Sequence, residues 1–548
     1  MVEFQCVSWN SEDVHEEDSD DDDDEKFKAV KSQFIIYIYG RTELGKSVCA
    51  EVSFNPYFFV NVPKTWKTDD LEIFEKAVKR FIGKRLELNF KGAKLVNRKK
   101  FYGFTNNEIF RFVRLVFKSK SAFYRAQKMF DKPVSLVNGF NKKMEVYEAN
   151  IDPMLRFAHV QDIQFAGWAT IENYTKVKNI SKKHFVDIEL KCNYSDIKYD
   201  SRPTIAPLVQ ASFDIEVYSS DGGFPDPNDE MSPFIQVATT LQRVGEPEPY
   251  KRHLISYGTC DPIGDGVELE VYKDEGEALN AWARLLIKEG VDILIGYNIW
   301  GFDLHYMHTR ACMTNADEFF KLSKRKDLRV KCKETQFTSG AYGASDFKMV
   351  DTPGRLQIDL LVIIKREHKL TSYTLNNVSE HFLKDKKVDM TPKEMFRCYE
   401  GSSADRCKIG IYCIKDTDLP LKLVNKLAIV PNMIEMSKAT WVPMSFLTER
   451  GQSIKVFSTL LYFTRKDDML VLTLARDRPK EDQEFEGATV LNAKKGAYMK
   501  RPITGLDFAS LYPTIMRAHN LSHDTLVMDT KYDNLEGIEY YEHAGYKF

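Results

Sequence analysis

Ala211–Ser219, which reads A-S-F-D-I-E-V-Y-S, places two acids one residue apart inside an apolar run. Residues two apart in a β-strand project from the same face, so Asp214 and Glu216 emerge together while Phe213, Ile215 and Val217 face a core. Two neighbouring carboxylates repel each other, and this repulsion favours a bound cation. Taken alone, the pattern also fits a solvated edge strand that happens to carry two acids. The rest of the chain decides between these interpretations.

The chain has 548 residues, enough for three or four domains. Its nine cysteines contain no C-x-x-C pair and no recurring spacing, so we expect neither a zinc ribbon nor a disulfide framework. This usage predicts a reducing, intracellular compartment. The N-terminus lacks the apolar core of a signal peptide, and no run of about 18 apolar residues occurs, so we predict a soluble protein without membrane contact.

The net charge of −2 conceals an uneven distribution, because Glu12–Glu25 holds eleven acids and no lysine or arginine. Without this run, 78 basic residues face 69 acidic ones, so the remaining body is mildly basic. That balance suits a partner made of phosphates. We predict that residues 1–30 form an acidic, disordered tail that solubilises the protein, with specific docking as the alternative.

Residues 31–205 are predicted to form a β-rich N-terminal domain. Phe34–Tyr39 and Val48–Val62 are rich in β-branched and aromatic residues, and Leu71–Ile82 has the apolar spacing of a helix. Arg98–Phe104 mixes bases with aromatic residues, which suits either contact with a nucleic-acid strand or an ordinary loop.

Residues 206–430 alternate strand and helix patterns, which predicts an α/β domain. Val291–Tyr297 is typical of a buried strand, and the N-I-W-G-F-D that follows brings Asp303 just past its end, where sites gather in open α/β sheets. A predicted helix over Arg406–Leu427 carries Tyr412 and Asp416 at i, i+4 spacing, on one face. The same patterns predict strands over Phe234–Leu241 and Arg355–Ile364 and helices over Gly276–Lys288 and Lys369–Leu383.

Four carboxylates could therefore face one cleft, and their combined charge would be prohibitive without divalent metal. Carboxylate oxygens favour Mg²⁺ or Mn²⁺, and two ions about 4 Å apart would support phosphodiester hydrolysis. Tyr412, one turn before Asp416, would orient the attacking water. The predicted metal ligands are Asp214, Glu216, Asp303 and Asp416.

The segments F-D-I-E, N-I-W-G-F-D and Y-C-I-K-D resemble, in order and spacing, the three exonuclease motifs of family B DNA polymerases. The resemblance implies an RNase H-like 3′-to-5′ proofreading exonuclease and DNA contacts at Asn298 and Phe302. Two further stretches, G-R-L-Q-I-D-L-L-V-I-I-K-R-E-H and T-E-R-G-Q-S-I-K-V, are similar to delta-type polymerases and to the family's entry into the palm. The start of the chain looks most like the enzymes of large DNA viruses, which implies work in the nucleus or a viral replication compartment.

Thr504–Asn520 resembles the first polymerase motif of the family, which makes residues 431–548 the beginning of a palm. Gly505–Phe508 is predicted to be a strand that delivers a carboxylate. By resemblance, Asp507 together with Phe508 would ligate two catalytic metals, Ser510 and Leu511 would lie along the nucleotide phosphates, and Tyr512 would stack under the sugar. F-E-G-A-T-V resembles a template-binding loop and implies DNA contacts at Gly487 and Ala488, with Phe485 in place of a tyrosine.

The second polymerase motif with its Y-G-D-T-D-S hairpin and the basic finger helix do not occur in these residues, so the expected polymerase site is incomplete. The expected fold is thus α/β and α+β multidomain with a partial palm. Three functions remain: the N-terminal portion of a replicative DNA polymerase, a stand-alone 3′-to-5′ DNA exonuclease, or a non-catalytic DNA-binding remnant. The expected partners are primer-template DNA, a single-stranded 3′ end, deoxynucleoside triphosphates, a sliding clamp, and a second polypeptide that supplies fingers, thumb and the remaining palm.

Overall fold

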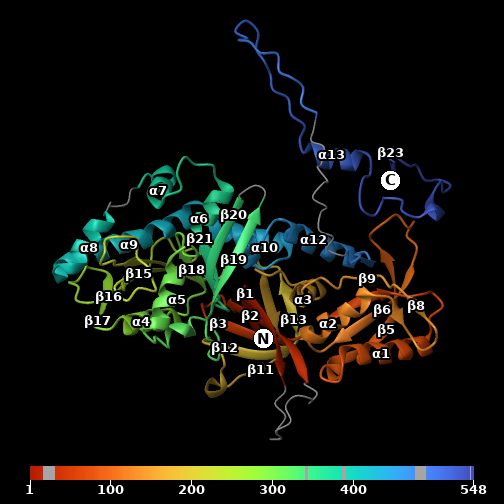
Figure 1. The fold of residues 1–548 in the computed structure, drawn as a ribbon, viewed down its shortest axis with the longest axis horizontal. Helices are drawn as coiled ribbons and strands as arrows, with labels where there is room; N and C mark the ends of the chain where they lie inside the picture. The colour runs from red at the N-terminus through yellow and green to blue at the C-terminus, as the bar shows by residue number, and fades with distance from the viewer. Residues whose placement is uncertain (16–30, 340–342, 386–389, 475–488, 544) are drawn as a thin grey trace.

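The computed structural model describes residues 1–15, 31–339, 343–385, 390–474, 489–543 and 545–548. Figure 1 shows two lobes, with the N-terminal domain on the right and the α/β domain on the left. Between them, near the centre of the view, run the first strands of the chain.

A seven-stranded sheet begins the N-terminal domain, in the order β11-β12-β3-β2-β1-β10-β13. Its core includes Phe4, Phe34 and Phe157. The helix α3 (Pro153–Gln161) begins at Asp152, whose side chain accepts a hydrogen bond from the Met154 N–H. The strands are β1 (Val2–His15), β2 (Ser32–Arg41), β3 (Ser47–Ser53), β10 (Trp168–Ile171), β11 (Thr175–Lys176), β12 (Ile188–Asn193) and β13 (Ile197–Asp200).

The predicted disordered tail is wrong for its first half, because Val2–His15 forms β1, which pairs with β10 at its start and with β2 from Gln5 onward. Strand formation is favoured by the buried side chains of Phe4, Cys6 and Val7. The acidic run starts inside this strand, where Glu12 pairs with Arg325 and accepts a hydrogen bond from the Tyr37 hydroxyl. Residues 16–30 of the predicted tail lie outside the described residues.

A second sheet completes the N-terminal domain, in the order β22-β5-β6-β4-β9. Two helices cover one of its faces and bury Phe58, Phe74 and Phe123 there. Along the chain, strands and helices follow the β-α-β-β-α-β order of ferredoxin-like folds. The elements are β4 (Tyr57–Asn61), α1 (Thr68–Ile82), β5 (Phe90–Lys100), β6 (Phe110–Phe117), α2 (Lys120–Gln127), β9 (Val146–Tyr147), β22 (Met469–Leu470) and the small hairpin β7 (Val134–Ser135) and β8 (Asn141–Lys142).

The strand β22 comes from much later in the chain, and so does part of the core around it. Leu470 packs against Phe59, Phe112 and Tyr147, and Leu461 belongs to the core of the first sheet. The predicted boundary at residue 431 therefore does not separate two packing units, because residues around 461–472 complete the N-terminal domain.

The α/β domain contains a six-stranded sheet in the order β17-β16-β15-β14-β18-β21. The central strand β14 (Val209–Val217) is antiparallel to β15 (Phe234–Arg243) and parallel to β18 (Ile293–Gly296), which confirms the predicted α/β architecture. The remaining elements are β16 (Lys251–Tyr257), β17 (Val267–Tyr272), α4 (Glu275–Lys288), α5 (Asp303–Met313), the hairpin β19 (Cys332–Ser339) and β20 (Gly343–Val350), β21 (Leu356–Asp359), α6 (Leu360–Glu367), α7 (Leu375–Leu383), α8 (Pro392–Glu400) and α9 (Ser403–Lys426).

The predicted strand over Arg355–Ile364 is only half right. It ends at Asp359, whose carboxylate accepts a hydrogen bond from the Leu361 N–H and so caps the helix α6. A buried cap of this kind stops the strand, although the apolar residues that follow also fit strand spacing.

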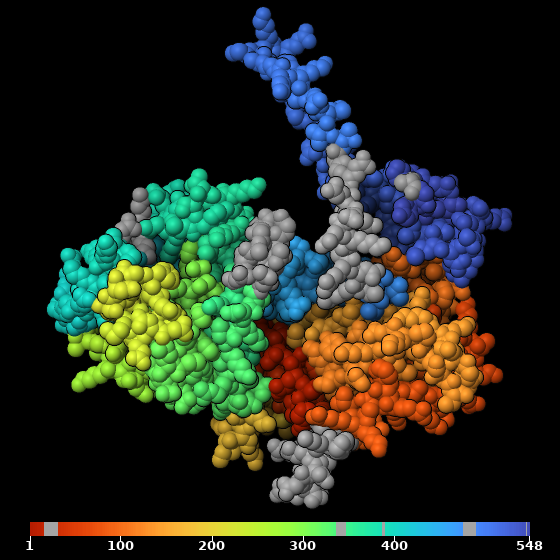
Figure 2. All heavy atoms as spheres, viewed as in Figure 1, coloured from red at the N-terminus to blue at the C-terminus, as the bar shows by residue number. Residues whose placement is uncertain are grey.

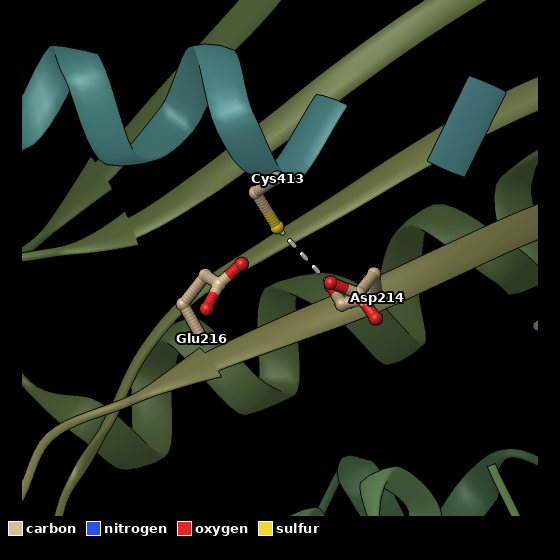
Figure 3. A group of neighbouring side chains, drawn as sticks. All are labelled: Asp214, Glu216 and Cys413. Carbon is tan, nitrogen blue, oxygen red and sulfur yellow. Dashed lines mark hydrogen bonds between the residues drawn. The ribbon is translucent and has the colours of Figure 1, made fainter. Parts of the chain in front are cut away.

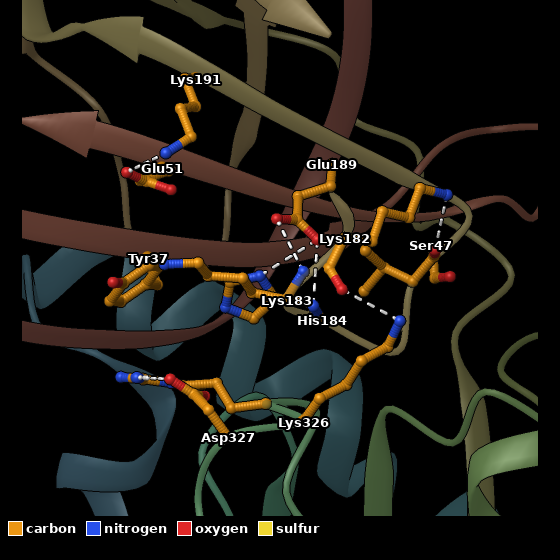
Figure 4. Close-up of polar contacts among 12 residues, drawn as sticks. Tyr37, Ser47, Glu51, Lys182, Lys183, His184, Glu189, Lys191, Lys326 and Asp327 are labelled. Atoms are coloured by element: carbon orange, nitrogen blue, oxygen red, sulfur yellow. Dashed lines mark hydrogen bonds and ion pairs between the residues drawn. The ribbon is translucent and has the colours of Figure 1, made fainter. Parts of the chain in front are cut away.

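A buried ion cluster joins the two lobes. Asp292 of the α/β domain lies 2.6 Å from Arg41 Nε on β2 and 2.5 Å from Lys324 Nζ. Beside it, the backbone of Lys183–Phe185 pairs with that of Lys324–Lys326, and Lys326 Nζ donates to the Lys182 carbonyl at 3.0 Å (Figure 4). The first sheet therefore forms a stable joint with the α/β domain.

The last part of the chain holds α10 (Ile429–Thr440), α11 (Met444–Glu449) and α12 (Ser453–Lys466), followed after a gap by α13 (Leu511–Ala518), β23 (Glu542–His543) and β24 (Tyr546–Lys547). Residues 489–510 extend away from the body (Figures 1 and 2). Residues 521–548 return to the N-terminal domain, where Gly103 N donates to His523 O at 2.8 Å and Phe104 N donates to Leu526 O at 2.7 Å. The basic aromatic stretch Arg98–Phe104, whose first three residues end β5, thus has a structural role as a contact for this segment.

Candidate active site

The strand β14 presents its two acids as the alternation predicts. Phe213, Ile215 and Val217 are buried in the core of the α/β domain, while Asp214 and Glu216 point to the opposite face. Glu216 is 5% exposed and Asp214 is half-buried. The solvated edge-strand alternative is wrong, because β14 lies in the interior of its sheet.

Asp303 begins α5, directly after a tight turn. Its carboxyl group is buried, and the backbone of Ile215, which lies between the two acids of β14, is among the groups that lower its pKa, so this carboxyl group lies close to that strand. Burial, with a smaller contribution from the nearby Asp359 carboxyl group, raises the pKa of Asp303 to about 7 against the lowering effect of nearby backbone N–H groups. An acid with this pKa is ready to lose its proton when a cation approaches.

The turn before Asp303 is shaped by a residue that our sequence reasoning missed. Asp359, buried at the end of β21, accepts hydrogen bonds from Asn298 N at 2.9 Å and Trp300 N at 3.1 Å. Asn298 has φ of 68°, a backbone conformation that asparagine adopts more readily than most residues. A signal existed in the sequence, because Asp359 follows an apolar strand at its carboxyl end, as Asp303 does.

The helix α9 brings Tyr412 and Asp416 to the same site. Burial raises the pKa of Tyr412 far above its ordinary value, and the next contributions come from Asp416, Glu216 and Asp214, in that order. The phenol therefore stays protonated and lies within electrostatic range of three of the four acids. A protonated hydroxyl can orient a water but cannot accept its proton as a base.

Cys413 is a second residue that the sequence reasoning missed. Its sulfur and one carboxylate oxygen each of Asp214 and Glu216 lie within 4.8 Å of one another, and its thiol donates to the Asp214 carbonyl at 3.5 Å (Figure 3). Burial, with help from Glu216, Asp214 and Asp416, raises the thiol pKa well above its ordinary value. A protonated thiol is a poor ligand for hard cations, so Cys413 spaces α9 from β14 rather than binding metal.

The chemistry of this donor set fits magnesium or manganese. The groups that converge from β14, α5 and α9 are carboxylates, and burial makes their mutual repulsion costly. Hard divalent cations with oxygen ligands neutralise such a set. The residues that could hold them are Asp214, Glu216, Asp303 and Asp416.

Aromatic rings lie beside the acids. The Phe302 ring, just before Asp303, is 5.2 Å from that of Tyr306 and 5.7 Å from that of Phe224. Phe224 is 84% exposed, although it is a large apolar side chain. Exposed rings next to an acidic cluster can stack on the bases of a single strand. Phe224 was not predicted, and its G-G-F-P context indicates only a turn.

The predicted palm residues lie apart from these acids. Asp507 and Phe508 are exposed on the extended segment, and the predicted strand over Gly505–Phe508 is wrong, because no described strand runs beside it to pair with it. Ser510, with φ of 52°, precedes α13, whose first residues are Leu511 and Tyr512. Gly487 and Ala488, like Phe485, lie outside the described residues.

These features define a class: a multidomain α/β protein with a carboxylate site suited to metal-dependent hydrolysis. Comparison with known proteins gives the family. The sequence model of "DNA polymerase family B, exonuclease domain" matches residues 144–378, and that of "DNA polymerase family B" matches residues 442–544. The first match ends before Tyr412 and Asp416, so their place in the site rests on the geometry above.

Relatives extend over nearly the whole chain. A DNA polymerase of Paramecium bursaria Chlorella virus NY2A is 36% identical over 98% of this chain and 56% of its own length. The DNA polymerase delta catalytic subunit of Glycine max is 36% identical over 90% of this chain and 46% of its own length. The chain belongs to the family B DNA polymerases, delta-like in kind, and spans about half the length of these relatives.

A solved structure supports the fold. The family B DNA polymerase from the archaeon Pyrobaculum calidifontis superposes with a TM-score of 0.67 and 19% identity, and the match covers 100% of this chain and 61% of that one. Among the helices that the structure describes, none is long and apolar enough to cross a membrane.

Proposed function

We propose that this chain is a 3′-to-5′ exonuclease that removes nucleotides from single-stranded DNA ends, and that it acts as the proofreading part of a replicative DNA polymerase. The observation that carries the proposal is the convergence of acids from three separate elements. The pKa of Asp303 is influenced by the backbone of Ile215, between Asp214 and Glu216, and the pKa of Tyr412 is raised by Asp416, Glu216 and Asp214, so the four acids lie close together.

Each residue then has a role in the reaction. Asp214, Glu216, Asp303 and Asp416 would hold two Mg²⁺ or Mn²⁺ ions, which supply a low-pKa water and stabilise the leaving oxygen. Tyr412 would position the attacking water with its hydroxyl. The Phe302 and Phe224 rings would stack on the terminal bases, and Asn298 would help to orient the strand beside them.

The second part of the proposal is a polymerase function. Asp507, with Phe508, would hold the polymerase metals, Ser510 and Leu511 would face the nucleotide phosphates, Tyr512 would lie under the sugar, and Gly487 and Ala488 would contact template DNA. The exposed apolar side chains of this segment, among them Leu506 at 92% and Phe508 at 72%, support a further polypeptide region that covers them. We infer that fingers, thumb and the remaining palm complete the site there.

A role in replication also implies particular substrates, partners and a cellular location. We propose primer-template DNA and deoxynucleoside triphosphates as substrates, a sliding clamp as an accessory partner, and the nucleus or a viral replication compartment as the place of action. These proposals rest on the family, whose relatives here are viral and delta-type polymerases.

A digestion assay tests the exonuclease. A 5′-labelled single-stranded oligonucleotide with Mg²⁺ should shorten from its 3′ end with the wild-type chain and remain intact with Asp214→Ala. Equal shortening by both proteins would point to a contaminating nuclease. Binding of the oligonucleotide without any shortening would favour the non-catalytic DNA-binding alternative.

A further inference from the structure

The loop that joins β14 to β15 carries the exposed Phe224 ring to the edge of the exonuclease site. This loop, residues 218–233, holds four acids and no lysine or arginine, so its charge repels phosphates. Phe224 is therefore the group by which the loop can hold a DNA strand, through stacking on an uncharged base. The position of the ring then depends on what fixes the loop.

The Phe224 ring has little support of its own. It lies 5.7 Å from the Phe302 ring in a T-shaped arrangement, and most of its surface faces solvent. Just before it the backbone makes a tight turn, in which Asp221 accepts hydrogen bonds from Gly223 N at 2.7 Å and from the Ser219 hydroxyl at 2.5 Å. The hydrogen bonds of this turn lie within the loop, so they do not fix where the loop lies on the domain.

The second half of the loop is fixed by Arg310 of α5. Arg310 Nη1 donates to the Asp229 carbonyl at 2.6 Å, and Asp229 also accepts from the Ser232 N–H at 3.1 Å and the Ser232 hydroxyl at 3.0 Å. The Tyr306 hydroxyl, one turn earlier on α5, donates to the Ser232 carbonyl at 2.7 Å. Arg310 and Tyr306 thus hold the loop against the helix that begins with Asp303.

Arg310 is itself held in place by a buried carboxylate. Its Nε and Nη2 donate to the two carboxylate oxygens of Glu275, at 2.7 and 2.6 Å. Glu275 begins α4 and also accepts from the N–H of Phe234, the first residue of β15, at 2.9 Å. A planar guanidinium can form such a two-pronged pair and keep a further N–H for the loop, whereas a lysine ammonium cannot match this geometry. Arg310 therefore ties the loop to α4, α5 and β15 at once.

The helix α5 serves both parts of the site. It begins with the proposed metal ligand Asp303, and Tyr306 and Arg310 lie three and seven residues further on, on the same side of the helix. A ring on a free loop would lose conformational freedom when it binds a base, and this loss weakens binding. A loop that α5 already holds has given up that freedom before the strand arrives.

We propose that Arg310 is a positioning residue for the exonuclease reaction, because it holds the 218–233 loop so that Phe224 can stack on the terminal base of a single strand. The inference rests on the proposed function, since it concerns how the same site holds its substrate. Affinity for the strand end is thus set in part by an arginine that is buried inside the protein.

Steady-state digestion of a single-stranded oligonucleotide with Mg²⁺ separates KM from kcat. Arg310→Lys keeps the charge beside Glu275 but cannot hold that carboxylate and the Asp229 carbonyl together. KM should therefore rise about tenfold, the worth of one stacking contact, while kcat stays within about threefold of the wild type. Tyr306→Phe removes a single hydroxyl from the same support and should raise KM about threefold.

A double variant shows whether Arg310 acts through Phe224. Phe224→Ala should raise KM about tenfold, and Arg310→Lys/Phe224→Ala should have the KM of Phe224→Ala, because no ring is left to position. The matched control is Arg284→Lys, at an exposed arginine of α4 that pairs with Glu318. It should keep the wild-type KM, since the loop does not depend on this pair.

Two results would overturn the role of Arg310. One is a wild-type KM in Arg310→Lys, and the other is a double variant whose KM rises by the product of the two single effects, which would show that the residues act independently. If Arg310→Lys misfolds, Tyr306→Phe takes its place in the same comparison with Phe224→Ala.

Strand binding can also be measured without cleavage, in Ca²⁺, with 2-aminopurine as the 3′-terminal base of the oligonucleotide. Stacking quenches the fluorescence of this base, so the wild-type chain should quench it more strongly than Arg310→Lys or Phe224→Ala. A wild-type chain that quenches the probe but does not digest DNA in Mg²⁺ would refute the proposed exonuclease and leave the role of Arg310 supported. Digestion by the wild type with equal quenching by all three proteins would refute the role of Arg310 alone.

Discussion

Asp303 is a buried carboxyl group with other acids close by, and its raised pKa links the exonuclease site to stability. Its pKa of about 7 in the folded protein lies above the value of 3.8 for a free carboxyl group. The folded state therefore holds this proton more tightly than the unfolded state. The stabilisation from protonated Asp303 is complete below pH 4 and is lost as the pH rises through 7.

We therefore expect metal to matter most at high pH. In EDTA, ionisation of Asp303 should lower the free energy of unfolding by up to about 4 kcal/mol at pH 8. Bound Mg²⁺ should offset this loss. Thermal melts should show a Mg²⁺-induced rise in Tm that grows between pH 5 and pH 8. In Asp303→Asn this growth should shrink, and an identical pH dependence in the two proteins would contradict the assignment.

Asp416 and Tyr412 should differ in their effect on digestion. Asp416→Ala removes a proposed metal ligand and with it charge stabilisation, so we expect a loss of about a thousandfold or more in rate. Tyr412→Phe removes only positioning of the water and should cost about tenfold to a hundredfold. Single-turnover digestion rates with Mg²⁺ measure both.

The control for this pair is Asp418→Ala, two residues further along α9. The Asp418 carboxylate is already engaged elsewhere, because it lies 3.0 Å from Arg252 Nε and accepts a hydrogen bond from the Thr240 hydroxyl at 3.0 Å. Its loss should leave the digestion rate within about threefold of the wild type. Equal rates for Asp416→Ala and Tyr412→Phe would show that the roles are assigned wrongly.

Among the secondary-structure elements, the turn between β18 and α5 depends on Asp359. Asp359→Ala leaves the Asn298 and Trp300 N–H groups without their acceptor, so the turn should shift and displace Asp303. We expect a tenfold to hundredfold loss in digestion rate, the usual cost of removing a group that orients a metal ligand. Asp351→Ala, which breaks only an exposed ion pair with Lys333, should digest normally. A normal rate for Asp359→Ala would remove its positioning role.

The sequence predicted those parts of the site that depend on residues near one another in the chain, and it missed those that depend on distant contacts. Asp214 and Glu216 were predicted because strand alternation is a local rule, and Tyr412 and Asp416 because helix spacing is another. The role of Asp359 was missed because its partners are about 60 residues away in the chain. Cys413 was missed because its contact with Asp214 exists only after α9 packs on β14.

The errors have the same origin. Gly505–Phe508 has the composition of a strand, but a strand also needs a neighbour, and no described strand lies beside it. The acidic first residues predicted disorder by composition, while the buried apolar side chains near the start of β1 and the pairing of this strand with β10 and β2 decided the outcome. In both cases a tertiary contact overrides the local pattern.

Over the whole molecule, the Asp292 cluster should control how firmly the lobes are joined. Burial alone would raise the pKa of Asp292, but Lys324 and Arg41 outweigh it and hold the pKa below its ordinary value. Asp292→Ala would leave two buried cations without their partner, which should cost about 3–5 kcal/mol. Asp317→Ala, at an exposed pair with Arg329, should cost less than about 1 kcal/mol. Urea unfolding of the three proteins gives the comparison.

Polymerisation is also a property of the whole molecule. The isolated chain should not extend a primer, because Asp507 lies exposed and belongs to no cluster of metal-ligating side chains among the described residues. A primer-extension assay with all four deoxynucleoside triphosphates and Mg²⁺ measures this directly. Extension that survives purification and is lost in Asp507→Ala would show that a second metal-binding acid exists in this chain.

The position of β22 late in the sequence affects how the N-terminal domain folds during synthesis. Tyr147 leaves the ribosome long before Leu470 and Leu472, the side chains that cover its ring. The delay of about 320 residues lasts on the order of tens of seconds at ordinary translation rates. During that interval the nascent chain would expose an apolar face of the sheet. We therefore expect chaperones that act during synthesis to bind it.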